Sequence, residues 1–174
     1  MRLDQKYFVP FILVCAAFTM LFIVISSFNF TERRQERFTD YTRQYNELLT
    51  KNHPYINKSD SLRLGDLKGN QVLVLFWASW SDKSAEIMKV LDEVKSQQEN
   101  FKVVAALVKD ATESIDEETL THDFEYIDGT ILFNELRAPG IPSFILLDES
   151  GELKFTHVGY KEGKVSELLM ASSE

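Results

Sequence analysis

A polar run at residues 81–84 is the part of the chain whose residue types and spacing come closest to a reactive site. It consists of Ser81, Asp82, Lys83 and Ser84, and it closely follows an apolar, β-branched segment at residues 71–77. A serine nucleophile needs an adjacent base that a third group holds in place. The chain has no Gly-x-Ser-x-Gly sequence. The histidines lie far away in the sequence, at His53, His122 and His157. We therefore expect no catalytic serine, and we assign Ser81 or Asp82 to the cap of a following helix.

The segments around this run alternate between strand and helix patterns. Short apolar runs are typical of strands buried on both faces, and apolar residues three or four apart indicate an amphipathic helix. A turn sequence that ends in Gly151 joins the last two strands into a hairpin. The predicted strands are 71–77, 101–108, 143–147 and 152–158, and the predicted helices are 84–98 and 161–171. This order predicts a small α/β sheet.

Residues 76–84, Phe-Trp-Ala-Ser-Trp-Ser-Asp-Lys-Ser, resemble the Phe-Trp-Ala-x-Trp-Cys-x-x-Cys run of thioredoxins. Three further matches follow the order of that family: a lead-in at 62–69, the Gly-Ile-Pro-Ser-Phe loop at 140–144, and a hairpin turn at 147–151 with Gly159 after it. Together they are similar to the membrane-anchored thioredoxin-like domains of the TlpA and ResA type. The resemblance implies an α/β thioredoxin-like fold, with a central mixed sheet flanked by helices.

The chain departs from that family at the residues that perform thiol-disulfide exchange. In the family a thiolate attacks a disulfide, and a second thiol resolves the mixed disulfide. The resemblance places Ser81 and Ser84 at the two cysteine positions, and a serine hydroxyl can do neither step. It also places Leu75 and Ile87 where family members carry an acid, although Glu86 lies next to Ile87. We expect a degenerate redox motif with no catalytic residue, no metal and no cofactor.

A peptide-binding surface is the second kind of site that the resemblance implies. In family members the loop before a cis-proline offers backbone hydrogen bonds to an extended segment, a form of strand addition. The matching residues are Trp80, Ile141 and Pro142, and we expect the Ile141-Pro142 bond to be cis. The alternative is that Trp77 belongs to the core and Trp80 only covers it.

An uncharged apolar run at residues 7–28 predicts a single transmembrane helix. As a helix it spans roughly 33 Å, enough to cross the hydrocarbon core. The alternative is a cleaved signal peptide, although no small-x-small cleavage site follows. Basic residues lie on both sides, so charge does not fix the orientation. The resemblance implies a soluble domain outside the cytoplasm, in a periplasm or at the cell exterior.

These boundaries divide the chain into four parts: a short segment at 1–6, the transmembrane helix at 7–28, a juxtamembrane stalk and linker at 29–58, and the thioredoxin-like domain at 59–174. A charged stretch at 31–52 predicts a stalk helix with one apolar stripe, which consists of Phe38, Tyr41, Tyr45 and Leu48. We expect this stripe to dock on the chain's own domain. A weak homodimer through the stalk is the alternative.

The charge of the chain limits its partners. A net charge of −8 argues against nucleic acid, because phosphate binding needs a basic surface. Residues 110–128 contain eight acids and no Lys or Arg. This segment lacks the ligand pattern of an EF-hand, so we expect a solvated acidic face. A weak site for a cation or a basic partner is the alternative.

Three functions are open at this point. The leading hypothesis is a redox-inactive, membrane-anchored binding or assembly module with an unknown protein partner. The second is an accessory of a thiol-disulfide oxidoreductase system, of the kind that serves cytochrome c maturation. The third is a structural spacer.

Overall fold

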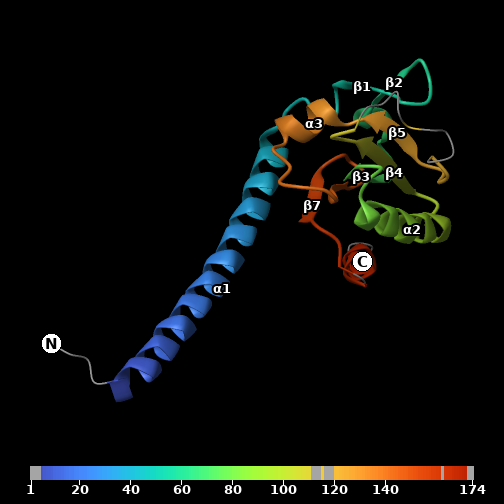
Figure 1. Ribbon diagram of the computed structural model, residues 1–174. Helices are drawn as coiled ribbons and strands as arrows, with labels where there is room; N and C mark the ends of the chain where they lie inside the picture. The colour runs from blue at the N-terminus through green and yellow to red at the C-terminus, as the bar shows by residue number, and fades with distance from the viewer. Residues whose placement is uncertain (1–4, 111–114, 116–119, 162, 172–174) are drawn as a thin grey trace. The chain divides into compact units, whose positions relative to one another are not determined.

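The computed structural model describes residues 5–110, 115, 120–161 and 163–171. The chain separates into two compact units, Met1–Glu36 and Arg37–Glu174. The first unit consists mainly of the long helix α1, Gln5–Gln44, coloured blue in Figure 1. The second unit contains the last turns of α1 and all of the other elements.

The N-terminal part of α1 is apolar and exposed. Residues Phe8–Ser26 have a mean hydropathy of 2.8, and this stretch is long and apolar enough to cross a membrane. It lies within the span predicted at 7–28. A signal sequence near the N-terminus passes the same test of length and composition, so the helix is a candidate membrane span.

The prediction of a stalk helix at 31–52 is wrong about where the helix ends. Helix α1 ends at Gln44, a turn follows, and β1 (Asn52–Pro54) then pairs with β2 (Ser61–Arg63) in a small antiparallel sheet. Tertiary packing explains the difference. Leu48 enters the core in the turn, and the buried His53 pairs with Leu62 across the small sheet, which holds this stretch in a non-helical conformation.

The apolar stripe docks on the chain's own domain, as predicted. Phe38 is fully buried, Leu48 is buried, and Tyr45 packs against the same cluster. Thr39 also hydrogen bonds through its hydroxyl to that of Thr156 at 2.6 Å. The second compact unit therefore begins at Arg37, inside the segment that the sequence assigned to the stalk. A homodimer through the stalk stays a prediction.

A mixed five-stranded sheet forms the centre of the second unit, with the strand order β5-β4-β3-β6-β7. Strands β3, β4 and β5 are parallel, and β6 and β7 are antiparallel to their neighbours. The strands are β3 (Gln71–Trp77), β4 (Phe101–Leu107), β5 (Glu125–Asp128), β6 (Ser143–Leu147) and β7 (Leu153–Val158). Four of them were predicted, and β5 was not, because its acidic surroundings suggested an exposed face.

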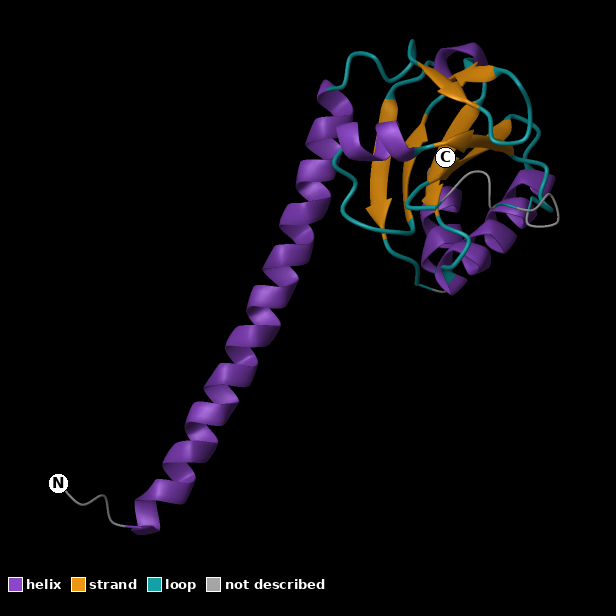
Figure 2. Cartoon of the chain, turned by 45° about the horizontal axis from the view of Figure 1, so that its top comes forward, coloured by secondary structure: helices purple, strands orange, loops and turns teal. Residues whose placement is uncertain are grey.

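Helices cover both faces of this sheet (Figure 2). In the described part of the second unit, the helices beyond α1 are η1 (Leu64–Leu67), α2 (Asp82–Gln97), α3 (Thr130–Glu135) and α4 (Lys164–Ala171). Alternate residues of β3 face opposite sides, as a pleated strand requires. Val72, Val74 and Phe76 join a cluster with Phe38 and α3, whereas Leu73, Leu75 and Trp77 join a cluster with α2 and α4. The sheet is thus buried on both faces and holds the β3–α2 loop on a rigid frame.

Candidate functional site

The polar run lies where β3 ends and α2 begins, at the carboxyl edge of the parallel strands. Ser81 is the N-cap of α2, with extended backbone angles of φ −100° and ψ 107°. Its Oγ accepts a hydrogen bond from the backbone N–H of Ser84 at 3.3 Å. Asp82 and Lys83, in the first turn, are exposed. The cap predicted from the sequence is confirmed, and it satisfies one of the free N–H groups of the helix.

The two serines differ in their accessibility. Ser81 is half-buried, whereas Ser84 is 1% exposed. The hydroxyl of Ser84 has no hydrogen-bond partner among the residues that the structure describes. Within the same part of the chain no histidine or carboxylate hydrogen bonds to either hydroxyl. Neither serine therefore has the base that nucleophilic catalysis needs.

Neither of the two positions at which the resemblance places an acid carries one. Leu75 and Ile87 are both fully buried and belong to one apolar cluster. Glu86, the neighbour of Ile87, is exposed. A shift of one residue therefore does not bring an acid into this interior. Charge that developed on residue 84 would lie in an apolar surrounding, which disfavours the ionised form.

The loop before α2 is held by the segment that follows β4. Asp110 accepts two hydrogen bonds at one carboxylate oxygen, from the backbone N–H of Ser79 at 2.9 Å and from its hydroxyl at 2.6 Å. The indole N–H of Trp80 donates to the carbonyl of Lys109 at 3.4 Å. Asp110 was not predicted as a site residue, because in the sequence it belongs to a stretch of acids that indicates a solvated face. The adjacency of β3 and β4 was the signal that could have found it.

The proline loop lies at the same edge of the sheet. The Ile141-Pro142 bond is cis, as predicted. Ser143 pairs with Phe76 across β6 and β3, so Pro142 comes next to the end of β3. Pro142 itself is buried, and its carbonyl accepts a hydrogen bond from the Gly159 N–H at 2.8 Å.

The residues predicted for peptide binding differ in exposure. Trp80 is 63% exposed and Ile141 is half-buried, whereas Trp77 is 2% exposed and belongs to the core. Exposed aromatic side chains are common anchors of protein interfaces. The fold therefore presents one large aromatic ring near the start of α2, and it places the Pro142 loop at the same edge.

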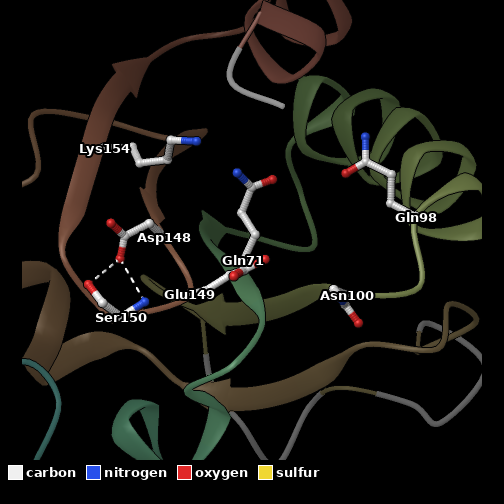
Figure 3. Close-up of a pocket in the computed structure, with 7 residues that line it drawn as sticks. All are labelled: Gln71, Gln98, Asn100, Asp148, Glu149, Ser150 and Lys154. Atoms are coloured by element: carbon white, nitrogen blue, oxygen red, sulfur yellow. Dashed lines mark hydrogen bonds between the residues drawn. The ribbon is translucent and has the colours of Figure 1, made fainter. Parts of the chain in front are cut away.

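A polar depression of about 540 Å³ lies at the opposite end of the sheet, by the start of β3 (Figure 3). Its lining includes Gln71, Gln98 and Lys154 and the turn between β6 and β7. In that turn Asp148 accepts hydrogen bonds from the hydroxyl and the N–H of Ser150. The Ser150 hydroxyl lowers the pKa of the Asp148 carboxyl. These are the contacts of a hairpin turn, and they satisfy the Asp148 carboxylate without any bound ligand.

The described acids of the segment 110–128 make defined contacts. Asp123 pairs with Lys95, which lowers the pKa of its carboxyl. Glu125 pairs with Lys58 at 3.2 Å, and Asp128 accepts from the Thr130 N–H. Glu113 and residues 116–118 lie outside the described residues. In the described part of the chain no three His, Cys, Asp or Glu residues form a group that could hold a metal ion.

No protein-family model matches the chain. No curated protein matches it significantly either.

Solved structures do match the fold. A secreted disulfide oxidoreductase of Mycobacterium tuberculosis, homologous to E. coli DsbE, aligns with a TM-score of 0.61 at 13% identity, over 72% of this chain and 98% of that chain. A putative thiol:disulfide interchange protein DsbE from Chlorobium tepidum gives 0.60 at 20% identity, over 70% and 92%. The exposed lipoprotein thioredoxin Etrx1 of Streptococcus pneumoniae gives 0.52 at 20% identity, over 71% and 98%. The chain therefore has a thioredoxin-like fold.

Proposed function

We propose that this chain is a membrane-anchored thioredoxin-like module that binds a protein partner outside the cytoplasm and exchanges no disulfides itself. One observation carries the proposal: the frame of a redox site is complete while its chemistry is missing. Ser81 caps α2 and the Pro142 loop adjoins β3, yet the two positions that the resemblance assigns to thiols hold serine. A domain that keeps this backbone arrangement but lacks thiols can still use the surface around it to bind a protein.

The surface that we assign to the partner comprises Trp80 and Ile141. Trp80 offers a large exposed ring, and in strand addition the backbone beside a residue such as Ile141 pairs with an extended segment. The anchor that we assign is Phe8–Ser26, which has the required length and composition. A location outside the cytoplasm is supported by the names of two structural neighbours, a secreted oxidoreductase and an exposed lipoprotein.

A second function is favoured by two of the structural neighbours, a disulfide oxidoreductase and a putative thiol:disulfide interchange protein. In that case the module is an accessory that docks on a cysteine-bearing protein of a thiol-disulfide system. The two functions share one docking surface and differ only in the partner. A structural spacer, the third candidate, would need no docking surface.

Site-specific photocrosslinking in cells tests the proposal. A photoreactive phenylalanine analogue replaces Trp80 or Ile141 in the full chain, and a control probe replaces Glu99, an exposed residue that precedes β4 at the other end of the sheet. We expect discrete crosslinked products from positions 80 and 141 and none from position 99. A crosslinked partner whose contact region contains a cysteine would favour the accessory role. Equal products at all three positions, or none, would contradict a docking surface here.

A reporter fused to the C-terminus tests the location separately. Alkaline phosphatase is active only outside the cytoplasm, so we expect phosphatase activity from this fusion. A silent phosphatase fusion together with a bright cytoplasmic fluorescent fusion would place the domain on the other side of the membrane.

A further inference from the structure

We infer that Asp110 is a positioning residue that fixes the loop between β3 and α2 and thereby presents Trp80 for partner contact. This inference rests on the proposed function, and it adds a residue that the sequence analysis did not assign. Trp77 and Leu107, the last residues of β3 and β4, are register partners, and the Val108 N–H donates to the Trp77 carbonyl at 2.9 Å. The segments that follow β3 and β4 therefore leave the sheet side by side.

Asp110 then joins the two loops. One carboxylate oxygen accepts from both donors of Ser79, the backbone N–H and the hydroxyl. Hydrogen bonds to an ionised acceptor are about twice as strong as those between neutral groups. Because both donors belong to the residue before Trp80, they fix the backbone from which the indole ring projects.

Lys109 provides a second restraint on the ring. Its φ of 57° is a left-handed conformation, which is strained for a non-glycine residue and persists only where neighbours impose it. In this conformation its carbonyl accepts the indole N–H of Trp80, and its ammonium group lies 5.4 Å from the centre of the Phe133 ring on α3. The turn at Lys109 and Asp110 thus contacts Trp80, Ser79 and α3 together.

These contacts hold the Trp80 side chain in one orientation, which a side chain that only covers the core would not need. The Trp80 ring is 63% exposed, so little packing holds it. An exposed ring without other restraints would lose rotamer freedom when a partner binds, and that loss weakens binding. Restraint by Ser79, Asp110 and Lys109 removes part of this cost before the partner arrives.

Fluorine NMR of the full chain in detergent micelles, labelled with 5-fluorotryptophan, tests the inference. The chain has two tryptophans, and buried Trp77 serves as the internal reference. We expect Asp110→Ala to shift and narrow the Trp80 resonance while the Trp77 resonance stays in place. Asp110→Asn should restore most of the wild-type signal, because its amide oxygen accepts the same two hydrogen bonds. Ser79→Ala should have an intermediate effect, because its backbone N–H still donates.

A matched control comes from the opposite end of the sheet. Asp148 also accepts hydrogen bonds from the N–H and the hydroxyl of a nearby serine, Ser150, so Asp148→Ala removes a similar turn contact. We expect it to leave the Trp80 resonance unchanged. The inference is overturned if Asp110→Ala leaves the Trp80 resonance unchanged, or if both tryptophan resonances move together.

Crosslinking separates this inference from the proposed function. With the photoreactive probe at Ile141, Asp110→Ala should lower the yield of the crosslinked product several-fold. An unchanged yield would show that the partner does not depend on an ordered Trp80 and would overturn the presentation role. No product from the wild-type sequence would instead contradict the proposed function, and the NMR result would then still decide whether Asp110 positions Trp80.

Discussion

Arg137 lies over the ring of Tyr41, with its guanidinium carbon 4.3 Å from the ring centre, and its Nη1 donates a hydrogen bond of 2.6 Å to the Tyr41 hydroxyl. The contact links the last turns of α1 to the segment that leads into the Ile141-Pro142 loop. Both residues belong to the second compact unit. The end of α1 is therefore part of the scaffold that supports the proposed docking surface.

Arg137 has a φ of 52°, a left-handed conformation in which a non-glycine residue is strained. Arg137→Ala loses the contact with Tyr41 and keeps the strain, whereas Arg137→Gly loses the same contact and removes the strain. We expect the glycine variant to be more stable than the alanine variant by about 1 kcal/mol. Urea denaturation of the fragment that starts at Arg37 measures the difference. A more stable alanine variant would contradict the left-handed conformation.

The start of the folded domain is a second testable point. Phe38 is fully buried and packs edge-on against Phe76 at 6.4 Å between ring centres. A fragment that starts at Arg37 should unfold cooperatively, whereas one that starts at Ser59 should not, because it lacks Phe38, Leu48 and β1. Circular dichroism during heating distinguishes the two outcomes.

A single substitution checks the same point without truncation. Phe38→Ala should destabilise the longer fragment by about 3–5 kcal/mol, the usual cost of a buried phenylalanine. Asp40→Ala, at an exposed position of the same helix, should change its stability by less than about 0.5 kcal/mol. If the shorter fragment unfolded with the same midpoint as the longer one, the docking of α1 would not contribute to the core.

His53 should make stability depend on pH. Its side chain is 2% exposed, and its Nε2 has no hydrogen-bond partner among the described residues. Burial lowers the pKa of His53, and nearby Lys51 lowers it further, while Glu135 and Asp128 act in the opposite direction. The unfolded chain therefore binds a proton near pH 6.5 that the folded chain does not bind until a lower pH. The stability that neutral His53 contributes is fully present above pH 6.5 and is lost as the pH falls toward the lower pKa of the folded state.

Denaturation of His53→Leu and of the wild-type fragment between pH 7.5 and 5 measures this dependence. We expect the wild type to lose stability over this range, and the variant to lose much less. Glu135 does not confuse the comparison, because hydrogen bonds from Lys51 and Tyr45 lower the pKa of its carboxyl, so it titrates in more acidic solution. Parallel pH profiles for the two proteins would exclude His53 as the cause.

The sequence predicted the elements that build the site better than the contacts that hold it. Strands β3 and β6 have the predicted bounds, because each is a continuous apolar run buried on both faces. Strand β5 and α3 were missed, since their short patterns follow an acidic stretch. The role of Asp110 follows from the adjacency of β3 and β4, which brings it to Ser79, 31 residues away; the pattern around either residue alone does not indicate that contact. The cis bond at Pro142 was predicted from the position of the proline in the resembling family.

Restoring the thiols tests the frame of the site. In Ser81→Cys with Ser84→Cys the two cysteines occupy the N-cap and third positions of α2, where the backbone already brings them together. We expect a disulfide to form readily, because the Ser84 N–H donates to both the carbonyl and the Oγ of Ser81 and so already holds the two residues close together. Its reductase activity should stay low, since Leu75 and Ile87 offer no acid to handle the proton. Alkylation with a mass label counts the free thiols. Ser84→Cys alone, which cannot form this bond, is the control.

Insulin reduction by the purified full chain in detergent is the measurement that tests the central claim most directly. The claim is that serine at positions 81 and 84 leaves a thioredoxin-like frame without thiol-disulfide exchange. Cys15, the only cysteine, lies in the apolar helix, so Cys15→Ser serves as the cysteine-free control. We predict that both proteins give the rate of dithiothreitol alone. Turnover by the wild-type chain above that of the Cys15→Ser control would contradict the account.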